Sequence, residues 1–282
     1  MCPIPVTVKK IINFPGGDAH IGNELLMRIN AACSGKCTLV EVFGGSGYIA
    51  QVADRSKFDT VVYNDINDKL TTFYRMVKEN PQELATWLMF LPYARSFNKI
   101  IMELFRTGNK ELGALETAAL LFYAVNSTLS GIGFMGHGGG FAYTIKPGRN
   151  HAVAFKSRVQ GMLELASRWR DIVIENRDFR DIIRVYDSAY TVFYLDPPFI
   201  GYRAKRYYGT VFTVGDLRDM AQLLTRVEGR FLLKVDDETY EYIKDVLPEG
   251  KFKVEKVEET LFLDKRRGKK RRMYVLVFVS NF

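Results

Sequence analysis

Short apolar runs rich in β-branched or aromatic residues recur along this chain, and most of them end in an acidic residue or a glycine turn. Between these runs, apolar residues recur at helical spacing, as at 68–78, 82–91, 157–168 and 216–226. This alternation is typical of βαβ units, in which helices connect successive parallel strands. The expected strands are 38–43, 60–64, 172–174, 192–195 and 231–235.

The chain departs from this alternation in two places. About a hundred residues separate the second expected strand from the third, far more than one crossover connection needs. We predict that residues 88–160 form an inserted lobe of helices and a glycine-rich loop, and that 1–87 and 161–282 form the main domain. Near the C-terminus, the strand-like segments 260–263 and 273–279 flank a strongly basic run, which predicts an antiparallel hairpin with a basic tip.

Composition limits the kinds of molecule that the chain can bind and the compartments in which it can work. The net charge of +8 suits a polyanion such as nucleic acid, because binding releases counterions from the phosphates. No apolar run approaches the ~20 residues of a membrane-spanning helix. The N-terminus lacks the apolar core of a signal peptide, so we expect a cytoplasmic protein. The three cysteines give neither a disulfide framework nor a zinc site, and neither a disulfide nor a metal is expected.

A glycine-rich turn follows the first expected strand. Phe43 leads into this turn, which consists of Gly44, Gly45, Ser46 and Gly47. Glycines there allow the backbone to approach a nucleotide-like ligand at the carboxyl edge of the sheet. Asp65 ends the next strand, where a carboxylate can accept hydrogen bonds from ribose hydroxyls. A nicotinamide-dependent oxidoreductase would show much the same pair of features.

A second motif favours different chemistry. The buried strand 192–195 runs into a stiff loop, whose four residues are Asp196, Pro197, Pro198 and Phe199. Prolines fix φ and cannot donate hydrogen bonds, so the loop offers a carboxylate, free carbonyls and one aromatic ring. Together these groups are suited to an exocyclic amino group and the flat ring that carries it.

In these motifs and their order, the chain resembles the D12-class DNA adenine-N6 methyltransferases, the family of the Dam enzymes. The resemblance implies an α/β fold with a Rossmann-like methyltransferase sheet, mostly parallel with an antiparallel C-terminal hairpin. It also makes the inserted, mainly helical lobe the target-recognition domain, and it implies that the main domain binds S-adenosylmethionine and double-stranded DNA, without a metal. The residues that match the family's donor-binding segments are Phe14, Gly16, Gly17, Phe43, Gly44, Gly45, Ser46, Gly47, Asp65, Asp178, Phe179 and Asp196.

The resemblance also implies roles for individual residues. Asp65 would bind the donor ribose and Asp178 the amino group of the donor adenine, although Asp178 could equally cap the helix that follows it. Asp196 and the Pro197 carbonyl would hold the target amine of a flipped base, with Phe199 stacked on that base. The chain has Asp18 where the family usually has lysine, and Phe199 where tyrosine is commoner.

Nucleic-acid contacts are expected from basic residues outside these motifs. The candidates for the phosphate backbone are Arg203, Lys205, Arg206, Lys269 and Arg271, and those for reading bases are Lys146, Arg149 and Asn150. Three alternatives to DNA adenine methylation remain open besides the oxidoreductase. They are methylation of cytosine N4, methylation of RNA adenine, and a DNA-binding homologue that has lost catalysis.

Overall fold

The computed structural model describes residues 11–12, 20–108, 111–129, 131, 140–145, 147–200, 212–261 and 272–282. The chain divides into two compact units, each built from segments that are far apart in sequence. The first comprises Met1–Leu26, Gly44–Ala53 and Thr60–Arg177. The second comprises Met27–Phe43, Asp54–Asp59 and Asp178–Phe282.

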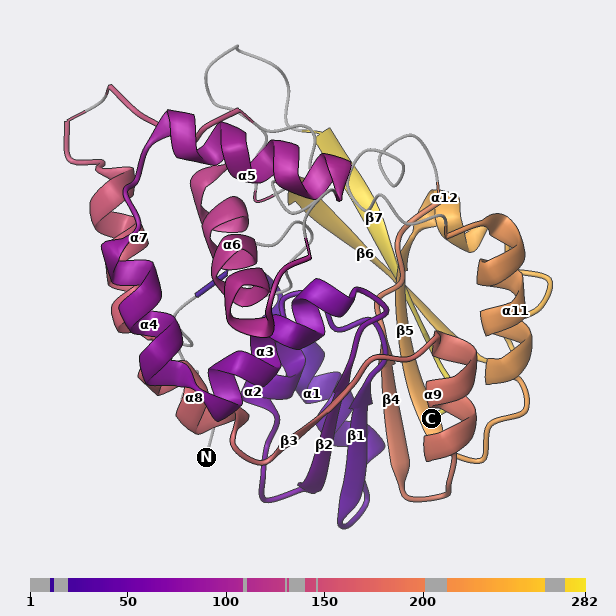
Figure 1. The fold of residues 1–282 in the computed structure, drawn as a ribbon. Helices are drawn as coiled ribbons and strands as arrows, with labels where there is room; N and C mark the ends of the chain where they lie inside the picture. The colour runs from indigo at the N-terminus through magenta and orange to yellow at the C-terminus, as the bar shows by residue number, and fades with distance from the viewer. Residues whose placement is uncertain are drawn as a thin grey trace. The chain divides into compact units, whose positions relative to one another are not determined.

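Seven strands form one sheet in the order β3-β2-β1-β4-β5-β7-β6 (Figure 1). Their bounds are β1 Cys37–Glu41, β2 Phe58–Asn64, β3 Ile172–Glu175, β4 Thr191–Leu195, β5 Arg230–Asp236, β6 Lys253–Leu261 and β7 Arg272–Ser280. β2 pairs with β3, and β4 with β1 and β5, all in parallel, whereas β7 is antiparallel to both β5 and β6. The predicted fold class, a mostly parallel α/β sheet with an antiparallel C-terminal hairpin, is therefore confirmed.

The sequence pattern located the parallel strands more closely than the hairpin. β4 is buried along its whole length, and such continuous apolar runs stand out in a sequence. β6 begins at Lys253, well before the predicted 260. It pairs only with β7 and is rich in charged residues, as edge strands often are, so it lacks a clear apolar alternation.

Helices make up most of the first unit. Their bounds are α2 Tyr48–Val52, α3 Asp68–Glu79, α4 Pro81–Phe90, α5 Arg95–Thr107, α6 Ala114–Ser127, α7 His151–Gln160 and α8 Met162–Trp169. α6 is buried along Ala118–Ser127 and contacts α3, α4, α5 and α7 (Figure 1). A helix that is apolar on nearly all sides belongs in an interior. The predicted inserted lobe, 88–160, lies within this unit, and its limits and its role stay a prediction.

One predicted helix is two. The single helix expected over 157–168 is interrupted at Gly161, where α7 ends and α8 begins. Gly161 has φ −75° and ψ 0° and lacks a side chain to favour the helical conformation. The helical apolar spacing continues across this joint, which is why the sequence pattern did not reveal it.

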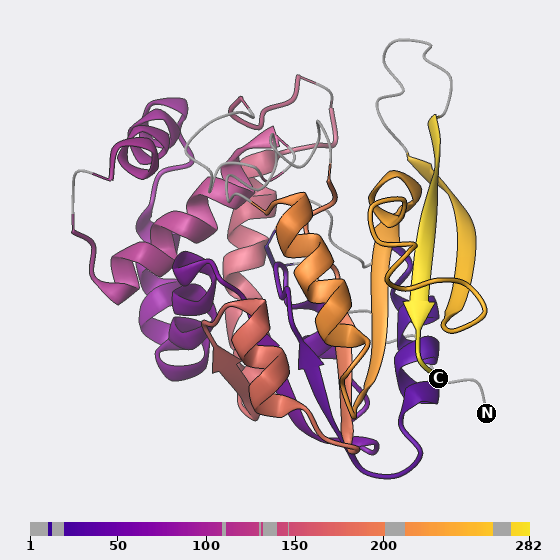
Figure 2. The same cartoon turned by 90° about the vertical axis from the view of Figure 1, so that its right-hand side faces the viewer.

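Three helices of the second unit follow its strands. They are α9 Phe179–Tyr186, α11 Val214–Leu224 and α12 Asp237–Tyr240. α9 and α11 lie side by side (Figure 2), and Arg180 of α9 forms ion pairs with Asp216 and Asp219 of α11. A further helix, α1 Gly22–Ala32, runs from the first unit into the second. None of the helices in the described ranges is long and apolar enough to cross a membrane.

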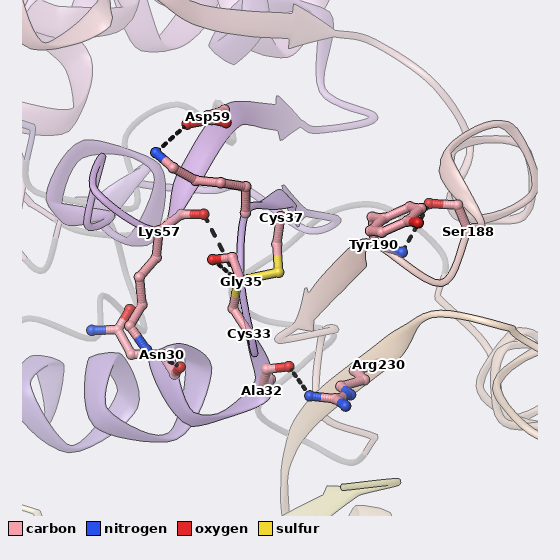
Figure 3. Close-up of a disulfide and its surroundings, with 11 residues drawn as sticks. Asn30, Ala32, Cys33, Gly35, Cys37, Lys57, Asp59, Ser188, Tyr190 and Arg230 are labelled. Atoms are coloured by element: carbon pink, nitrogen blue, oxygen red, sulfur yellow. Dashed lines mark hydrogen bonds and ion pairs between the residues drawn. A yellow bond between two sulfur atoms is a disulfide. The ribbon is translucent and has the colours of Figure 1, made fainter.

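The structure contains a disulfide that the sequence analysis did not expect. Cys33, just after α1, is bonded to Cys37, the first residue of β1, with a Cα–Cα distance of 6.0 Å (Figure 3). The prediction of no disulfide is therefore wrong, since three cysteines allow one disulfide and this one leaves only Cys2 over. A separation of four residues across a tight turn brings the two Cα atoms within the usual range for a disulfide.

Candidate active site

The glycine turn after β1 has a backbone conformation that requires glycine. Gly45 and Gly47 have φ angles of 48° and 61°, in the left-handed region. Gly44 is restricted by space instead, since a Cβ atom there would lie 2.1 Å from the Tyr63 ring. Substitution at any of the three positions would therefore displace the turn.

Buried aromatic side chains pack against this turn and form hydrogen bonds with its backbone. The Tyr63 hydroxyl donates a hydrogen bond to the Gly45 carbonyl at 3.1 Å, and the Tyr74 hydroxyl donates one to the Ser46 carbonyl. The Trp169 ring stacks on Tyr74 with 3.7 Å between centroids and 9° between planes. All three rings are fully buried, so the turn rests on a closely packed base.

Asp65, which follows β2, is hydrogen-bonded to the glycine turn. Its Oδ2 accepts the Gly45 N–H at 2.8 Å, and its Oδ1 accepts the Asn67 N–H at 2.8 Å. Burial raises the pKa of Asp65, and these two hydrogen bonds oppose the rise. Because a carboxylate oxygen can accept more than one hydrogen bond, each oxygen retains capacity for a ligand. The next side chain, Ile66, is 55% exposed and offers an open apolar surface beside the carboxylate.

In the second unit, three phenylalanine rings form a cluster. The Phe43 centroid lies 5.8 Å from that of Phe179 and 5.7 Å from that of Phe212. Asp178 precedes Phe179 and caps α9, since its Oδ1 accepts the Arg180 N–H at 2.8 Å. Asp178 also forms an ion pair with the Arg180 guanidinium at 3.3 Å. The helix-capping alternative for Asp178 is thus observed, and it leaves the predicted donor contact untested.

The loop of Asp196 follows β4 directly and is attached to β5 and α12. Asp196 Oδ2 lies 2.7 Å from Nζ of Lys234, a buried residue of β5. Beyond the prolines, the Ile200 N–H donates to Thr239 Oγ1 at 2.9 Å. Pro197 is buried, whereas Pro198 and Phe199 are partly exposed. The Asp196 carboxylate is therefore held in place and remains partly accessible, with 20% of its side-chain surface exposed.

The family model for D12 class N6 adenine-specific DNA methyltransferases matches residues 15–260, which contain both the glycine turn and the Asp196 loop. The chain belongs to this family. Members of this class are enzymes that methylate adenine in DNA, so the chain is assigned to the methyltransferases. No curated protein matches the chain in sequence.

Two solved structures show only a weak likeness to this family member. A ribosomal protein L11 methylase from Lactobacillus delbrueckii subsp. bulgaricus is 11% identical, with a TM-score of 0.37 over 95% of this chain and 81% of that one. A conserved hypothetical protein from Streptococcus pyogenes is 12% identical, with a TM-score of 0.35 over 92% of this chain and 94% of that one.

The structure describes only part of the predicted site of this D12-class protein. Gly45 and Asp65 are in direct contact in the first unit, and Phe43 and Phe179 are in contact in the second. Arg149 is exposed, and Asn150 caps α7 by accepting the N–H groups of Ala152 and Val153. The predicted residues that lie outside the described ranges are Phe14, Gly16, Gly17, Lys146, Arg203, Lys205, Arg206, Lys269 and Arg271.

Sequence reasoning missed two buried polar residues near these motifs. Lys234 gives no signal in the sequence except a single charge within an apolar strand. Asn126, at the end of α6, is 3% exposed, and its Nδ2 donates to the Ile11 carbonyl at 3.1 Å. This bond holds Ile11, which precedes the predicted donor-binding residues Phe14, Gly16 and Gly17 in the sequence. Among the described residues, no three histidine, cysteine, aspartate or glutamate side chains gather where they could hold a metal ion.

Proposed function

We propose that this protein transfers a methyl group from S-adenosylmethionine to the N6 amino group of adenine in double-stranded DNA. The observation that carries the proposal is the Asp196 loop. It presents an anchored, partly exposed carboxylate at the end of β4, within a chain that matches the adenine-specific family over residues 15–260. A carboxylate at that place suits an exocyclic amine, which needs hydrogen-bond acceptors.

The donor groups of the first unit fit S-adenosylmethionine. Asp65 can accept hydrogen bonds from ribose hydroxyls, and the exposed Ile66 side chain can pack against the face of the donor adenine. The resemblance to the family also assigns donor contacts to Phe43, Asp178 and Phe179, which belong to the second unit. When bound, S-adenosylmethionine supplies a methyl group already activated on a sulfonium centre.

The residues of the Asp196 loop prepare the acceptor. The adenine amine is a poor nucleophile because its lone pair is delocalised into the ring. Asp196 and the Pro197 carbonyl accept its two N–H hydrogen bonds, which favours a pyramidal nitrogen with a localised lone pair. That lone pair would then form a bond to the methyl carbon as the sulfur–methyl bond breaks, which leaves S-adenosylhomocysteine, and the surplus proton of the amine would pass to solvent water. The loop contributes position and electrostatics rather than a covalent intermediate.

DNA must present the base outside the duplex. Flipping requires a few kcal/mol, and stacking on Phe199 returns about 1–3 kcal/mol. We assign the phosphate contacts to Arg203, Lys205, Arg206, Lys269 and Arg271, and we assign target recognition to the 88–160 lobe, with Lys146, Arg149 and Asn150 as its base-reading candidates. A protein acting on chromosomal DNA in this way would work in the cytoplasm.

The test is transfer of labelled methyl groups from S-adenosylmethionine to unmethylated duplex DNA, with Asp196→Ala as the inactive control. Nucleoside mass spectrometry should find the label in N6-methyladenine with the wild type and none with the variant. Label in N4-methylcytosine, or in RNA alone, would assign a different acceptor. A folded wild-type protein that binds DNA and transfers nothing would instead be a homologue without catalysis, and the proposal would be wrong.

A further inference from the structure

Lys234 is a charged residue in the interior of a strand. It lies within the run Phe231–Val235 of β5, which is otherwise apolar and buried throughout, and Lys234 itself is only 4% exposed. An ammonium group in such surroundings is strongly disfavoured unless a counter-charge meets it. Asp196 provides that counter-charge, with 2.7 Å between Nζ and Oδ2.

The register of the sheet produces this ion pair. β4 and β5 are parallel, and Leu195 is aligned with Leu233. One residue further along each strand, Asp196 and Lys234 follow side by side. The register of two buried strands therefore places these two residues next to each other. An ion pair between long, exposed side chains would lack this constraint.

A neighbouring cation, Arg28, already has a carboxylate partner. On β7, the residue aligned with Lys234 is Phe278, and the Arg28 guanidinium lies over its ring at 4.6 Å. Arg28 forms an ion pair with Glu255, the residue of β6 aligned with Phe278. Lys234 of β5 is therefore paired with Asp196, and Arg28 is paired with Glu255 of β6.

We propose that Lys234 is a positioning residue for methyl transfer, which binds one oxygen of Asp196 and thereby orients the other toward the target amine. The inference rests on the proposed function, because it takes Asp196 as the acceptor for that amine. An ionised carboxylate accepts hydrogen bonds through both oxygens. With Oδ2 held by Lys234, rotation of the Asp196 carboxylate is restricted, which favours a preorganised acceptor.

A double-mutant cycle tests the proposal. Lys234→Met keeps an unbranched apolar stem and removes the charge, and Asp196→Asn removes the carboxylate's charge. Single-turnover methyl transfer is measured for the wild type, both single variants and the double variant. Lys234→Met should lower the rate about 10- to 100-fold, the range expected for a lost hydrogen bond to a charged group. In the Asp196→Asn background, the same change should have less than about a twofold effect, because coupled residues are not additive.

Three controls separate positioning from folding. Lys253→Met is the matched variant, because Lys253 is a strand lysine that pairs with Glu255 at 2.8 Å but is well exposed, and its rate should equal that of the wild type. Calorimetry should give S-adenosylmethionine affinities within about threefold of the wild type for the single Lys234 variants and for Lys253→Met, since Lys234 acts on the acceptor side. Lys234→Arg retains the cation and should be faster than Lys234→Met. If Lys234→Met does not fold, Lys234→Gln, which keeps a neutral donor, takes its place in the cycle.

The outcomes are distinct. A folded Lys234→Met protein within about twofold of the wild-type rate would overturn the inference and leave the proposed function intact. Equal losses in both backgrounds would also overturn it, because Lys234 would then act independently of Asp196. If the wild type transfers no methyl group to any DNA, the proposed function fails and this inference fails with it.

Discussion

Gly47→Ala should destabilise the protein through two separate effects. Gly47 has a φ of 61°, and an alanine in this left-handed conformation costs roughly 1–2 kcal/mol. The new methyl group would also lie 2.5 Å from Cζ2 and 2.8 Å from Cη2 of Trp169. Trp169 is fully buried and stacked on Tyr74, so it cannot move aside freely. Overpacking of this kind typically costs about 1–3 kcal/mol, and the two effects together predict a loss of about 2–5 kcal/mol.

Thermal unfolding followed by circular dichroism measures this loss. For a chain of this size, about 2–5 kcal/mol corresponds to a fall in Tm of roughly 3–10 °C. The matched control is Gly35→Ala, because a Cβ atom at Gly35 would have no neighbour within 4 Å and Gly35 has no positive φ. Its Tm should stay within about 2 °C of the wild type. If Gly47→Ala and Gly35→Ala shifted Tm equally, the argument from backbone conformation and from Trp169 would be refuted.

Three further predictions concern ligand binding, pH and the disulfide. Asp65→Asn should weaken S-adenosylmethionine binding about 10- to 100-fold in calorimetry, because a charged acceptor is lost, and unchanged affinity would exclude the proposed ribose contact. Burial pushes the pKa of Asp216 upward, but hydrogen bonds led by that from Arg180 prevail and lower it to about 2 from 3.8. Ionised Asp216 therefore stabilises the fold above pH 3.8, and this contribution is lost as the pH falls toward 2. Asp216→Asn should lower the free energy of urea unfolding by about 1–2 kcal/mol at pH 7 and by much less near pH 2, whereas an equal deficit at both would count against the ion pair. Reducing the Cys33–Cys37 bond should lower the free energy of unfolding by about 2 kcal/mol, because the loop it closes is short. A Cys33→Ser protein should unfold identically with and without reductant, and a wild type insensitive to reductant would contradict the prediction.

The features that could be predicted from the sequence are those set by local pattern. Each parallel strand was located within two residues of its observed ends, because continuous apolar runs and the polar residues that end them are visible in the chain itself. The contact between Asp65 and Gly45 was not itself predicted, but it agrees with the expected places of the two residues after neighbouring strands. Parallel strands end at one edge of a sheet, so residues just after two such strands lie near each other.

Other features depend on contacts that a single sequence does not display. The break between α7 and α8 arises at a glycine that the helical apolar spacing passes over. Asn150 is predicted to read bases, and its side-chain oxygen also caps α7, a role that the sequence analysis did not give it. The cap is observed, and the base contact stays a prediction.

Lys234 shows where a conflict within the sequence was itself informative. Its neighbours predict a buried strand, and a lysine in a buried strand violates that pattern. When one residue contradicts the structure that its neighbours predict, that residue is often at a functional or strained position. The prediction that could have been made from sequence is therefore that some carboxylate must meet this ammonium group. Its identity required the register, because only the alignment of Leu195 with Leu233 brings Asp196 to Lys234. The same reasoning applies to any lone charge within an apolar strand beside a catalytic loop, and here it links an unremarkable lysine to the acidic residue on which the proposed chemistry depends.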